Sequence, residues 1–432
     1  MTHLSWLSIV RLGLVQLCLG AIVVLTTSTL NRLMVVELAL PAVLPGLLVG
    51  LHYAIQITRP NWGFLSDSGG NRTRFIILGM MTLALGGFLA ALGLVVMSGA
   101  YWPGLALSVV AYALIGLGVG ASGTSLLALL ATATHPRRRA AAATITWLMM
   151  IFGIAVTATV VGSMLDPYSP SRLLELVAGV GGVAVVLTGL AIWGIERRHG
   201  GVVQPQTTRQ SFRAGMAEIW QERRARHFTL FIFLSMVAYF MQELILEPYA
   251  GLAFGFTPGQ STQLSGAQNG GVFIGMLTVG IAATGLRVGS LRVWVMVGCA
   301  GSALALLAIA VAGQVAGGTV ALLPATVALG LFNGMFAVAA IGSMMALAGE
   351  GRQEREGTRM GLWGASQAIA AGVGGLFGAG AVDLARHLTD TASAFGLVFL
   401  LEAGLFAAAA LMAFHIIEAR RQPGLGRMVP GE

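Results

Sequence analysis

Four acidic residues interrupt stretches that are otherwise apolar, and they offer the clearest chemistry in this chain. Glu37, Glu243, Glu247 and Glu402 fall inside or beside such stretches. An ionised carboxylate there is costly and therefore indicates function by default. Glu243 and Glu247 are four positions apart, so a helix places both on one face. Proton binding and release is the chemistry that we consider for Glu243 and Glu402.

Two interpretations of these acids stay open. Glu247 precedes Pro248, which favours a helix boundary at this point. Glu247 either binds a ligand or forms an ion pair at the membrane interface with an arginine such as Arg32. Glu402 takes part in proton coupling, or it is a protonated acid satisfied by a serine or a backbone group.

His52 is the histidine that falls well inside an apolar stretch. A neutral imidazole can ligate a metal ion, and it can equally hydrogen-bond within the membrane, here with Gln56. Other polar residues, Asn333 among them, either line a binding cavity or join helices to one another. Both alternatives stay open for each of these residues.

Composition identifies the elements that position these residues. Of 432 residues, 56% are apolar and 10% are charged, against roughly 25% charged residues in soluble domains. A soluble globular protein is therefore excluded. All 25 basic residues are arginines, which excludes a lysine Schiff base and a P-loop lysine. Cys18 and Cys299 lie far apart within apolar stretches, so we expect no disulfide framework and no thiolate metal site.

The apolar stretches predict an all-α integral membrane protein, because a spanning helix needs about 20 apolar residues. Two groups of six stretches flank a polar segment. We expect an N-terminal half over 1–195, a linker over 196–226, a C-terminal half over 227–418 and a tail over 419–432. The twelve predicted spans are 11–30, 42–62, 75–97, 104–131, 140–163, 173–195, 228–247, 264–284, 292–313, 319–347, 360–381 and 394–417.

Arginines mark the orientation of these spans. Of the 25, only Arg32, Arg172 and Arg386 fall in loops on one side, and the others belong to the opposite side. The positive-inside rule then places both termini and the linker in the cytoplasm. Membrane orientation accounts for the charge of +8, so we expect no nucleic-acid partner.

The two halves resemble each other. A shift of 216 residues, half the chain length, superposes Trp147 on Trp363 and a glycine-rich stretch followed by arginines in each half. Two six-helix halves related by an axis along the membrane normal are the architecture of the major facilitator superfamily. We therefore predict the major facilitator fold.

The loop GFLSDSGGNRTR resembles a motif that follows the second helix in that superfamily. The resemblance implies a conformational latch, in which an acid accepts hydrogen bonds from a helix N-terminus and from arginines. Ser68 and Asn71 stand where the motif has arginines, so part of its charge network is missing. The latch residues are Gly63, Asp67, Arg72 and Arg74.

The segment MQELILEPYAGLAFGFTPGQSTQLSGAQNGG, from Met241 to Gly271, carries a more specific resemblance. It is similar to the PucC/LhaA family, the bacteriochlorophyll-delivery branch of the major facilitator superfamily. The segment LHYAIQITRPNWGFLSD supports it. Ala250 stands where a glycine is usual in the family.

This resemblance implies a function. The protein would deliver bacteriochlorophyll to light-harvesting or reaction-centre complexes and assist their assembly. Its partners would be light-harvesting polypeptides, chlorophyll synthase, the membrane insertion machinery and lipid, in the bacterial inner (intracytoplasmic) membrane. His52 would ligate the pigment magnesium. The pigment-binding candidates are His52, Gln242, Glu243, Glu247, Tyr249 and Asn333.

We also consider two other functions. A proton-coupled transporter of another hydrophobic small molecule is the alternative, with Glu243 and Glu402 as its proton carriers. An enzyme is not expected, because we find no nucleophile with a base, no metal cluster and no nucleotide loop in the sequence.

Overall fold

The structure is a computed structural model that describes residues 4–58, 62, 71–135, 138–196, 222–286, 288–315, 317–349 and 356–416. Every regular element in these ranges is a helix. Eleven helices in the described part of the chain are long and apolar enough to cross a membrane, and the shorter apolar helix Val43–Ile55 occupies the second predicted span. The expected all-α multi-pass membrane protein is confirmed.

The N-terminal half contains six spans. The first combines α1 with two π-helical segments and a short α-helix, and the second continues from α3 into a 3-10 turn. The elements are α1 (Trp6–Val24), η1 (Leu25–Thr29), α2 (Leu30–Arg32), η2 (Leu33–Glu37), α3 (Val43–Ile55), η3 (Gln56–Thr58), α5 (Arg72–Met97), α6 (Tyr101–Ala133), α7 (Arg139–Leu165) and α8 (Pro170–Ile192).

The C-terminal half repeats this arrangement with six long helices. A typical one, such as α16 with 26 residues, is about 39 Å long at 1.5 Å per residue, which exceeds the roughly 30 Å of membrane hydrocarbon. The elements are α11 (Arg223–Phe254), α12 (Pro258–Val279) with η5 (Gly280–Gly285), α13 (Leu291–Ala312), α14 (Thr319–Gly349), α15 (Glu356–Arg386) and α16 (Thr391–Ile416).

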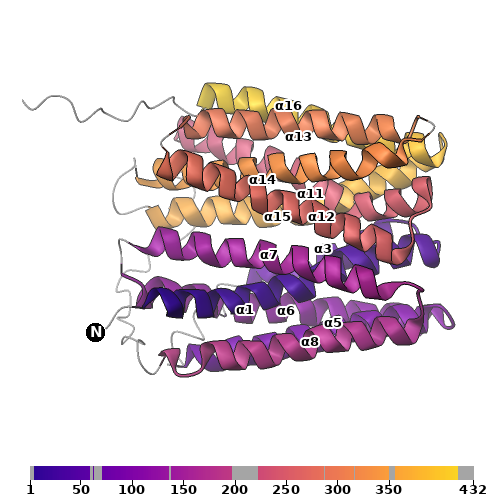
Figure 1. The fold of residues 1–432 in the computed structure, drawn as a ribbon, viewed down its shortest axis with the longest axis horizontal. Helices are drawn as coiled ribbons and strands as arrows, with labels where there is room; N and C mark the ends of the chain where they lie inside the picture. Colours follow the sequence, from indigo (N-terminus) through magenta and orange to yellow (C-terminus); the bar gives the residue numbers. More distant parts are fainter. Residues whose placement is uncertain are drawn as a thin grey trace, which may run out of the picture.

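The halves lie side by side, with the indigo-to-magenta helices on one side and the orange-to-yellow helices on the other (Figure 1). Each half has its own large cluster of buried apolar side chains. The halves meet mainly where α7 packs on α12 and α3 packs on α15. We call the end of the bundle that carries Glu196 and Glu222 the linker end, and the end that carries Asp166 and Phe256 the distal end.

The predicted helix boundary at Pro248 is wrong. Helix α11 continues through Pro248 to Phe254 and ends at Gly255, whose φ of 70° is left-handed. A proline cannot donate to the carbonyl four residues before it, here that of Leu244. Asn31 Nδ2, from the first span, donates to this carbonyl at 2.7 Å. The other half of the protein therefore satisfies the group that the proline leaves free.

Candidate functional site

A polar segment of the first span contacts the C-terminal half. Residues 26–29 read TTST and are all buried. Ser28 Oγ donates to Glu247 Oε1 of α11 and lies 2.9 Å from Ser265 Oγ of α12. Thr29 Oγ1 lies 3.3 Å from Thr262 Oγ1, also on α12. Hydroxyl groups from one half thus meet an acid and two hydroxyl groups from the other.

Glu247 is 1% exposed, so it is buried inside the protein. Arg32, its expected partner, instead donates from Nη1 to Glu37 Oε1 at 2.5 Å and from Nη2 to the Phe256 carbonyl at 2.7 Å. Burial of a carboxyl group costs free energy unless hydrogen bonds compensate it. The Ser28 hydroxyl supplies that compensation for Oε1 of Glu247, while Oε2 has no hydrogen-bond partner among the described residues.

Glu243 lies one helical turn nearer the linker end and faces the same way. The hydroxyl groups of Thr27 and Tyr53 are within hydrogen-bonding reach of its carboxyl group. The Tyr53 ring packs edge-on against Phe240, with 5.9 Å between ring centroids. Glu243 is only half-buried, in contrast to Glu247. The two acids therefore form one stripe along α11, and Glu243 is its accessible member.

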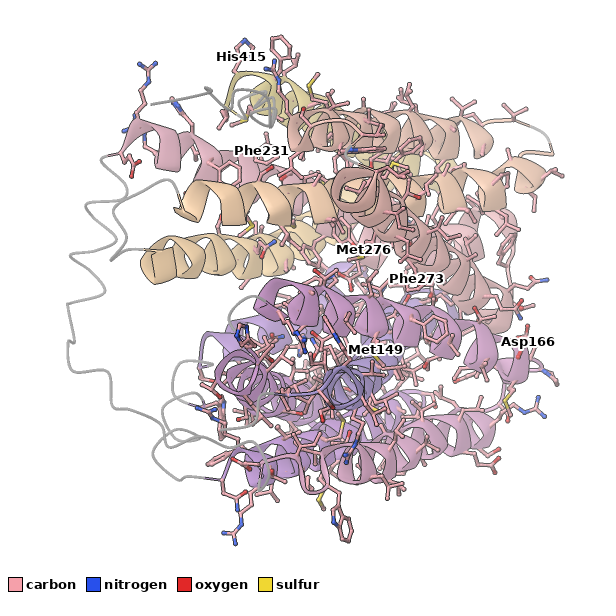
Figure 2. All side chains as sticks on the ribbon, turned by 60° about the vertical axis from the view of Figure 1, so that its left-hand side comes forward. Met149, Asp166, Phe231, Phe273, Met276 and His415 are labelled. Atoms are coloured by element: carbon pink, nitrogen blue, oxygen red, sulfur yellow. The ribbon has the colours of Figure 1, made fainter. Side chains whose placement is uncertain are left out.

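Apolar side chains continue the contact between the halves beside this stripe. Phe273 and Met276 of α12 point toward the N-terminal half, near α7 (Figure 2). Phe152 and Phe273 have their ring centroids 5.6 Å apart. Ile151 joins Met276 in a small buried cluster of its own.

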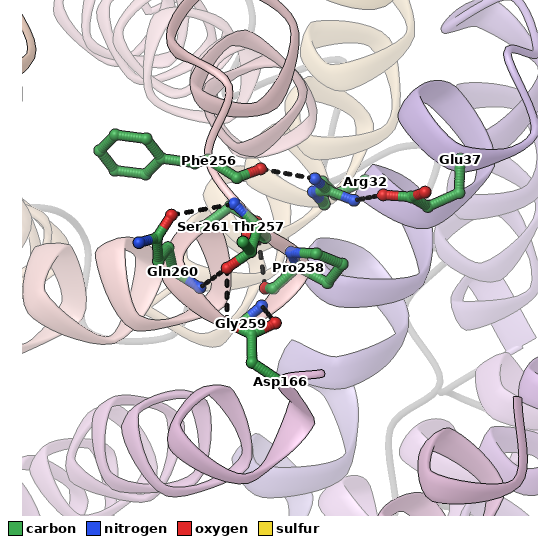
Figure 3. A network of polar contacts seen from close by, with 9 residues as sticks. All are labelled: Arg32, Glu37, Asp166, Phe256, Thr257, Pro258, Gly259, Gln260 and Ser261. Carbon is green, nitrogen blue, oxygen red and sulfur yellow. Dashed lines mark hydrogen bonds and ion pairs between the residues drawn. The ribbon is translucent and has the colours of Figure 1, made fainter. Parts of the chain in front are cut away.

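At the distal end the halves are joined by charged groups (Figure 3). Asp166, which follows α7, accepts from Thr257 Oγ1 at 2.5 Å and from the Gly259 amide at 3.0 Å. Thr257 and Gln260 form a capping box that begins α12. The carboxylate of one half thus lies at the positive N-terminus of a helix in the other. Burial, and then the charge of Glu37, raises the pKa of the nearby Tyr168.

A second acid makes the reciprocal contact. Asp383 of α15 accepts from the amides of Ala42 at 2.9 Å and Val43 at 2.7 Å, at the start of α3. These amides lack partners within their own helix. Asp166 and Asp383 therefore connect the halves in opposite directions, each capping a helix of the other half.

His52 lies inside the N-terminal half and is 2% exposed. Its Nε2 is 2.9 Å from the Gln56 side chain, and its ring packs against Tyr53 with centroids 4.9 Å apart. The contact with Gln56 is the structural alternative that the sequence allowed. Ligation of a pigment magnesium by His52 stays a prediction.

The remaining candidates lie within the C-terminal half. Tyr249 donates to the Ile309 carbonyl at 3.0 Å, and Asn333 accepts from Ser302 Oγ at 2.8 Å. Gln242 is 2% exposed and Glu402 0% exposed. The structure thus brings Glu243 and Glu247 to the boundary between the halves, while Gln242, Tyr249, Asn333 and Glu402 belong to one half.

Of the four latch residues, Gly63 and Asp67 lie outside the described residues. Arg72 Nη1 donates to Thr132 Oγ1 at 2.5 Å and to the Ala128 carbonyl at 3.2 Å. The Arg74 amide donates to Asn71 at 3.2 Å. The latch as a whole stays a prediction.

Glu196 makes a contact of the type expected of Asp67. It accepts from the amides of Arg72 and Thr73, at 2.7 and 2.8 Å, at the start of α5. Sequence reasoning missed this acid, together with Asp166, Asp383, Ser28 and Ser265. The available signals were acids beside helix starts and the runs TTST and GQSTQLS within apolar stretches.

Comparisons with known proteins identify the family. The family model described as PUCC protein matches residues 29–421. The chain belongs to the PucC family. It is 30% identical to Protein PucC of Cereibacter sphaeroides, over 92% of this chain and 89% of that one. It is 66% identical to the Bacteriochlorophyll synthase 44.5 kDa chain of Rhodobacter capsulatus, over 99% of this chain and all of that one.

Solved structures show that this PucC-family chain has the major facilitator fold. A mutant form of the nucleoside transporter NupG matches with a TM-score of 0.70 and 16% identity, over 95% of this chain and 99% of that one. The peptide transporter POT in complex with sulfate matches with a TM-score of 0.70 and 13% identity, over 96% of each chain. At these identities the likeness concerns the fold alone.

One expectation needs correction. Catalytic motifs were not found in the sequence, and we expected no enzyme. The 66% identical relative bears the name of a chain of bacteriochlorophyll synthase, and this finding contradicts the expectation. Motif searches test one chain for a complete catalytic constellation, so they do not address a subunit that works with an enzyme.

Proposed function

We propose that this protein handles bacteriochlorophyll in association with the machinery that synthesises it, and delivers the pigment to light-harvesting or reaction-centre complexes during their assembly. The main support is 66% identity, over nearly the whole chain, to a relative named as a bacteriochlorophyll synthase chain. The PucC family match supports the link to assembly. The site of action would be the bacterial inner (intracytoplasmic) membrane, with both termini in the cytoplasm.

The acids of α11 support a place for this cargo. A bacteriochlorophyll has an apolar ring and tail with a few polar groups, which suits a mainly apolar site with a small number of placed polar side chains. Glu243 is half-buried at the boundary between the halves, beside Thr27 and Tyr53. We assign Glu243 and Tyr53 to the polar part of the pigment. His52 is the candidate ligand of its magnesium.

Pigment content of the purified protein tests this proposal. The protein is purified in mild detergent from a phototrophic host, and bacteriochlorophyll is extracted and counted per chain. We expect a fixed ratio in the native protein, and a ratio reduced by at least half in Glu243→Gln and in His52→Ala. Glu175→Gln is the matched control, because Glu175 is exposed on α8. Colourless preparations of every variant and of the native protein would refute the proposal.

Partner capture tests the enzyme-associated part separately. The tagged native protein is isolated from the same membranes, and co-purifying proteins are identified by mass spectrometry. We expect chlorophyll synthase and light-harvesting polypeptides above the level found with an unrelated tagged membrane protein. Equal recovery with both baits would contradict an association with synthesis and assembly.

A further inference from the structure

Glu402 occupies the middle of α16 and is 0% exposed. Neither of its carboxylate oxygens has a hydrogen-bond partner among the residues that the structure describes. An ionised carboxylate in such a place would be strongly unfavourable. A protonated carboxyl group has one donor as well as acceptor capacity, so its needs differ from those of the anion.

An aromatic layer fixes how three helices are aligned around this acid. Tyr249 Oη of α11 donates to the Ile309 carbonyl of α13 at 3.0 Å. The Tyr249 ring centroid is 5.3 Å from that of Phe395 on α16. The three residues therefore lie at one depth, with Tyr249 and Phe395 facing each other.

The next polar layer follows from helix geometry. Seven residues make about two turns, which return to nearly the same face about 10 Å further along. Helices α11 and α13 run from the linker end to the distal end, and α16 runs the opposite way. On each helix we take the residue seven positions nearer the linker end. It is Gln242 for Tyr249, Ser302 for Ile309 and Glu402 for Phe395.

A separate contact places Asn333 in the same layer. Phe336 of α14 and Phe406 of α16 have ring centroids 6.1 Å apart. One turn toward the distal end from this pair lie Asn333 and Glu402. Ser302 Oγ donates directly to Asn333 Oδ1 at 2.8 Å. Two independent contacts therefore agree on the depth of Glu402.

The unused atoms in this layer complement a neutral acid. Gln242 Oε1 is a buried acceptor and Asn333 Nδ2 a buried donor, each without a partner among the described residues. Asn333 can donate to one oxygen of Glu402, and a protonated Glu402 can donate to Gln242 Oε1. An ionised Glu402 has no proton to donate, so its carboxylate oxygen and Gln242 Oε1 would both be acceptors. We propose that Gln242, Ser302, Asn333 and Glu402 form a proton-binding site in which Glu402 is the residue that holds the proton.

The two acids of α11 and Arg292 of α13 make their contacts elsewhere. On α13, Arg292 stacks on Phe414 near the linker end, and Cys299 is a buried free thiol one turn from Ser302. On α11, Glu243 faces Thr27 and Tyr53, and Tyr249 is bonded to Ile309.

Helices α14 and α15 of this half place no charge beside Glu402 either. On α15, Asp383 is bonded to the amides of Ala42 and Val43, and Arg386 ends the helix. On α14, the sequence of Thr319–Gly349 contains no acidic, basic, tyrosine or cysteine residue. No cation in the described part of these helices therefore compensates an ionised Glu402.

Infrared spectroscopy of the purified protein at pH 7 tests the site, because a protonated carboxyl group has a C=O band distinct from that of a carboxylate. We expect the difference between native protein and Glu402→Gln to show the loss of one protonated carboxyl band. The exposed acid serves as control, so Glu175→Gln removes no such band. A spectrum in which Glu402→Gln loses only carboxylate absorption would overturn the proposal.

A second variant tests the partner and does not require any change at Glu402. Gln242→Leu removes the acceptor, so the protonated band persists but moves to higher frequency. An unchanged band position would contradict the layer. The proton site does not rest on the proposed function, and the bacteriochlorophyll content of the same samples reports on that function separately.

Discussion

Ser28 of the first span donates a hydrogen bond to Glu247 of α11, and 219 positions of sequence separate the two residues. The same hydroxyl group is 2.9 Å from Ser265 of α12. One buried contact therefore ties the N-terminal half to two helices of the C-terminal half. Glu247 lies one helical turn from Glu243, which we assign to the proposed pigment site.

Removal of this hydroxyl group is expected to destabilise the protein. Ser28→Ala leaves Glu247 buried without its donor, a loss of about 1–3 kcal/mol in the free energy of unfolding. Detergent-solubilised protein is melted in parallel with Ser163→Ala, whose native hydroxyl donates within its own helix at an exposed position. Equal melting temperatures for the two variants would show that the Ser28 contact contributes nothing.

The distal carboxylates are expected to hold the halves together. Asp383→Ala removes the acceptor of two amides at the start of α3, at a cost of about 1 kcal/mol. Spin labels at Ser171 and His387, which are both exposed, report the distance between the halves at this end. We expect a broader and longer distance distribution in Asp383→Ala, and the same change in Asp166→Ala.

Asp390→Ala is the control for this experiment. Asp390 accepts from the Ser393 amide at 3.1 Å and so caps α16 within the C-terminal half alone. Its loss leaves the contact between the halves intact. If all three aspartate variants broadened the distribution equally, the idea that Asp166 and Asp383 hold the halves together would be rejected.

The sequence was sufficient for the spans but not for their contacts. Length and hydropathy locate all twelve helices, because an apolar stretch of this length satisfies its backbone in lipid by forming a helix. Several ends are displaced, and α11 runs seven residues beyond its predicted end at residue 247. Pro248 was misinterpreted because local rules govern only the helix itself. Asn31, which donates to the Leu244 carbonyl that Pro248 leaves free, is 213 positions from Leu244.

The sequence predicts which acids belong to the site, but it does not predict which residues they contact. Glu243 and Glu247 stand out as acids in a span, and their spacing correctly places them on one face. The sequence does not show which helix this face meets, because the alignment of packed helices depends on side chains from distant segments. Ser28 and Ser265 therefore escaped notice, since serine is also common as a contact residue between membrane helices.

The cap of α16 gives a pH-dependent prediction. Hydrogen bonds from Ser393, first from its side chain and then from its backbone amide, lower the pKa of Asp390. A carboxyl group with a lower pKa in the folded state stabilises the fold above its unfolded pKa, and this contribution is lost as the pH falls through the folded value. We therefore expect native protein to lose melting temperature relative to Asp390→Asn only below about pH 4. A constant difference from pH 7 to pH 3 would contradict this linkage.

Close packing of α12 on α14 gives the sharpest matched pair of substitutions. A Cβ atom added at Gly275 would lie 2.0 Å from the Leu331 carbonyl oxygen, whereas one added at Gly270 meets nothing within 4 Å. Both glycines belong to α12, so alanine improves the helix propensity of each to the same extent. Gly275→Ala must also push two backbones apart, which we expect to cost about 1–3 kcal/mol. Melting of both variants in one detergent measures the difference, and a Gly275→Ala variant as stable as Gly270→Ala would show that α12 and α14 pack less closely than the structure indicates.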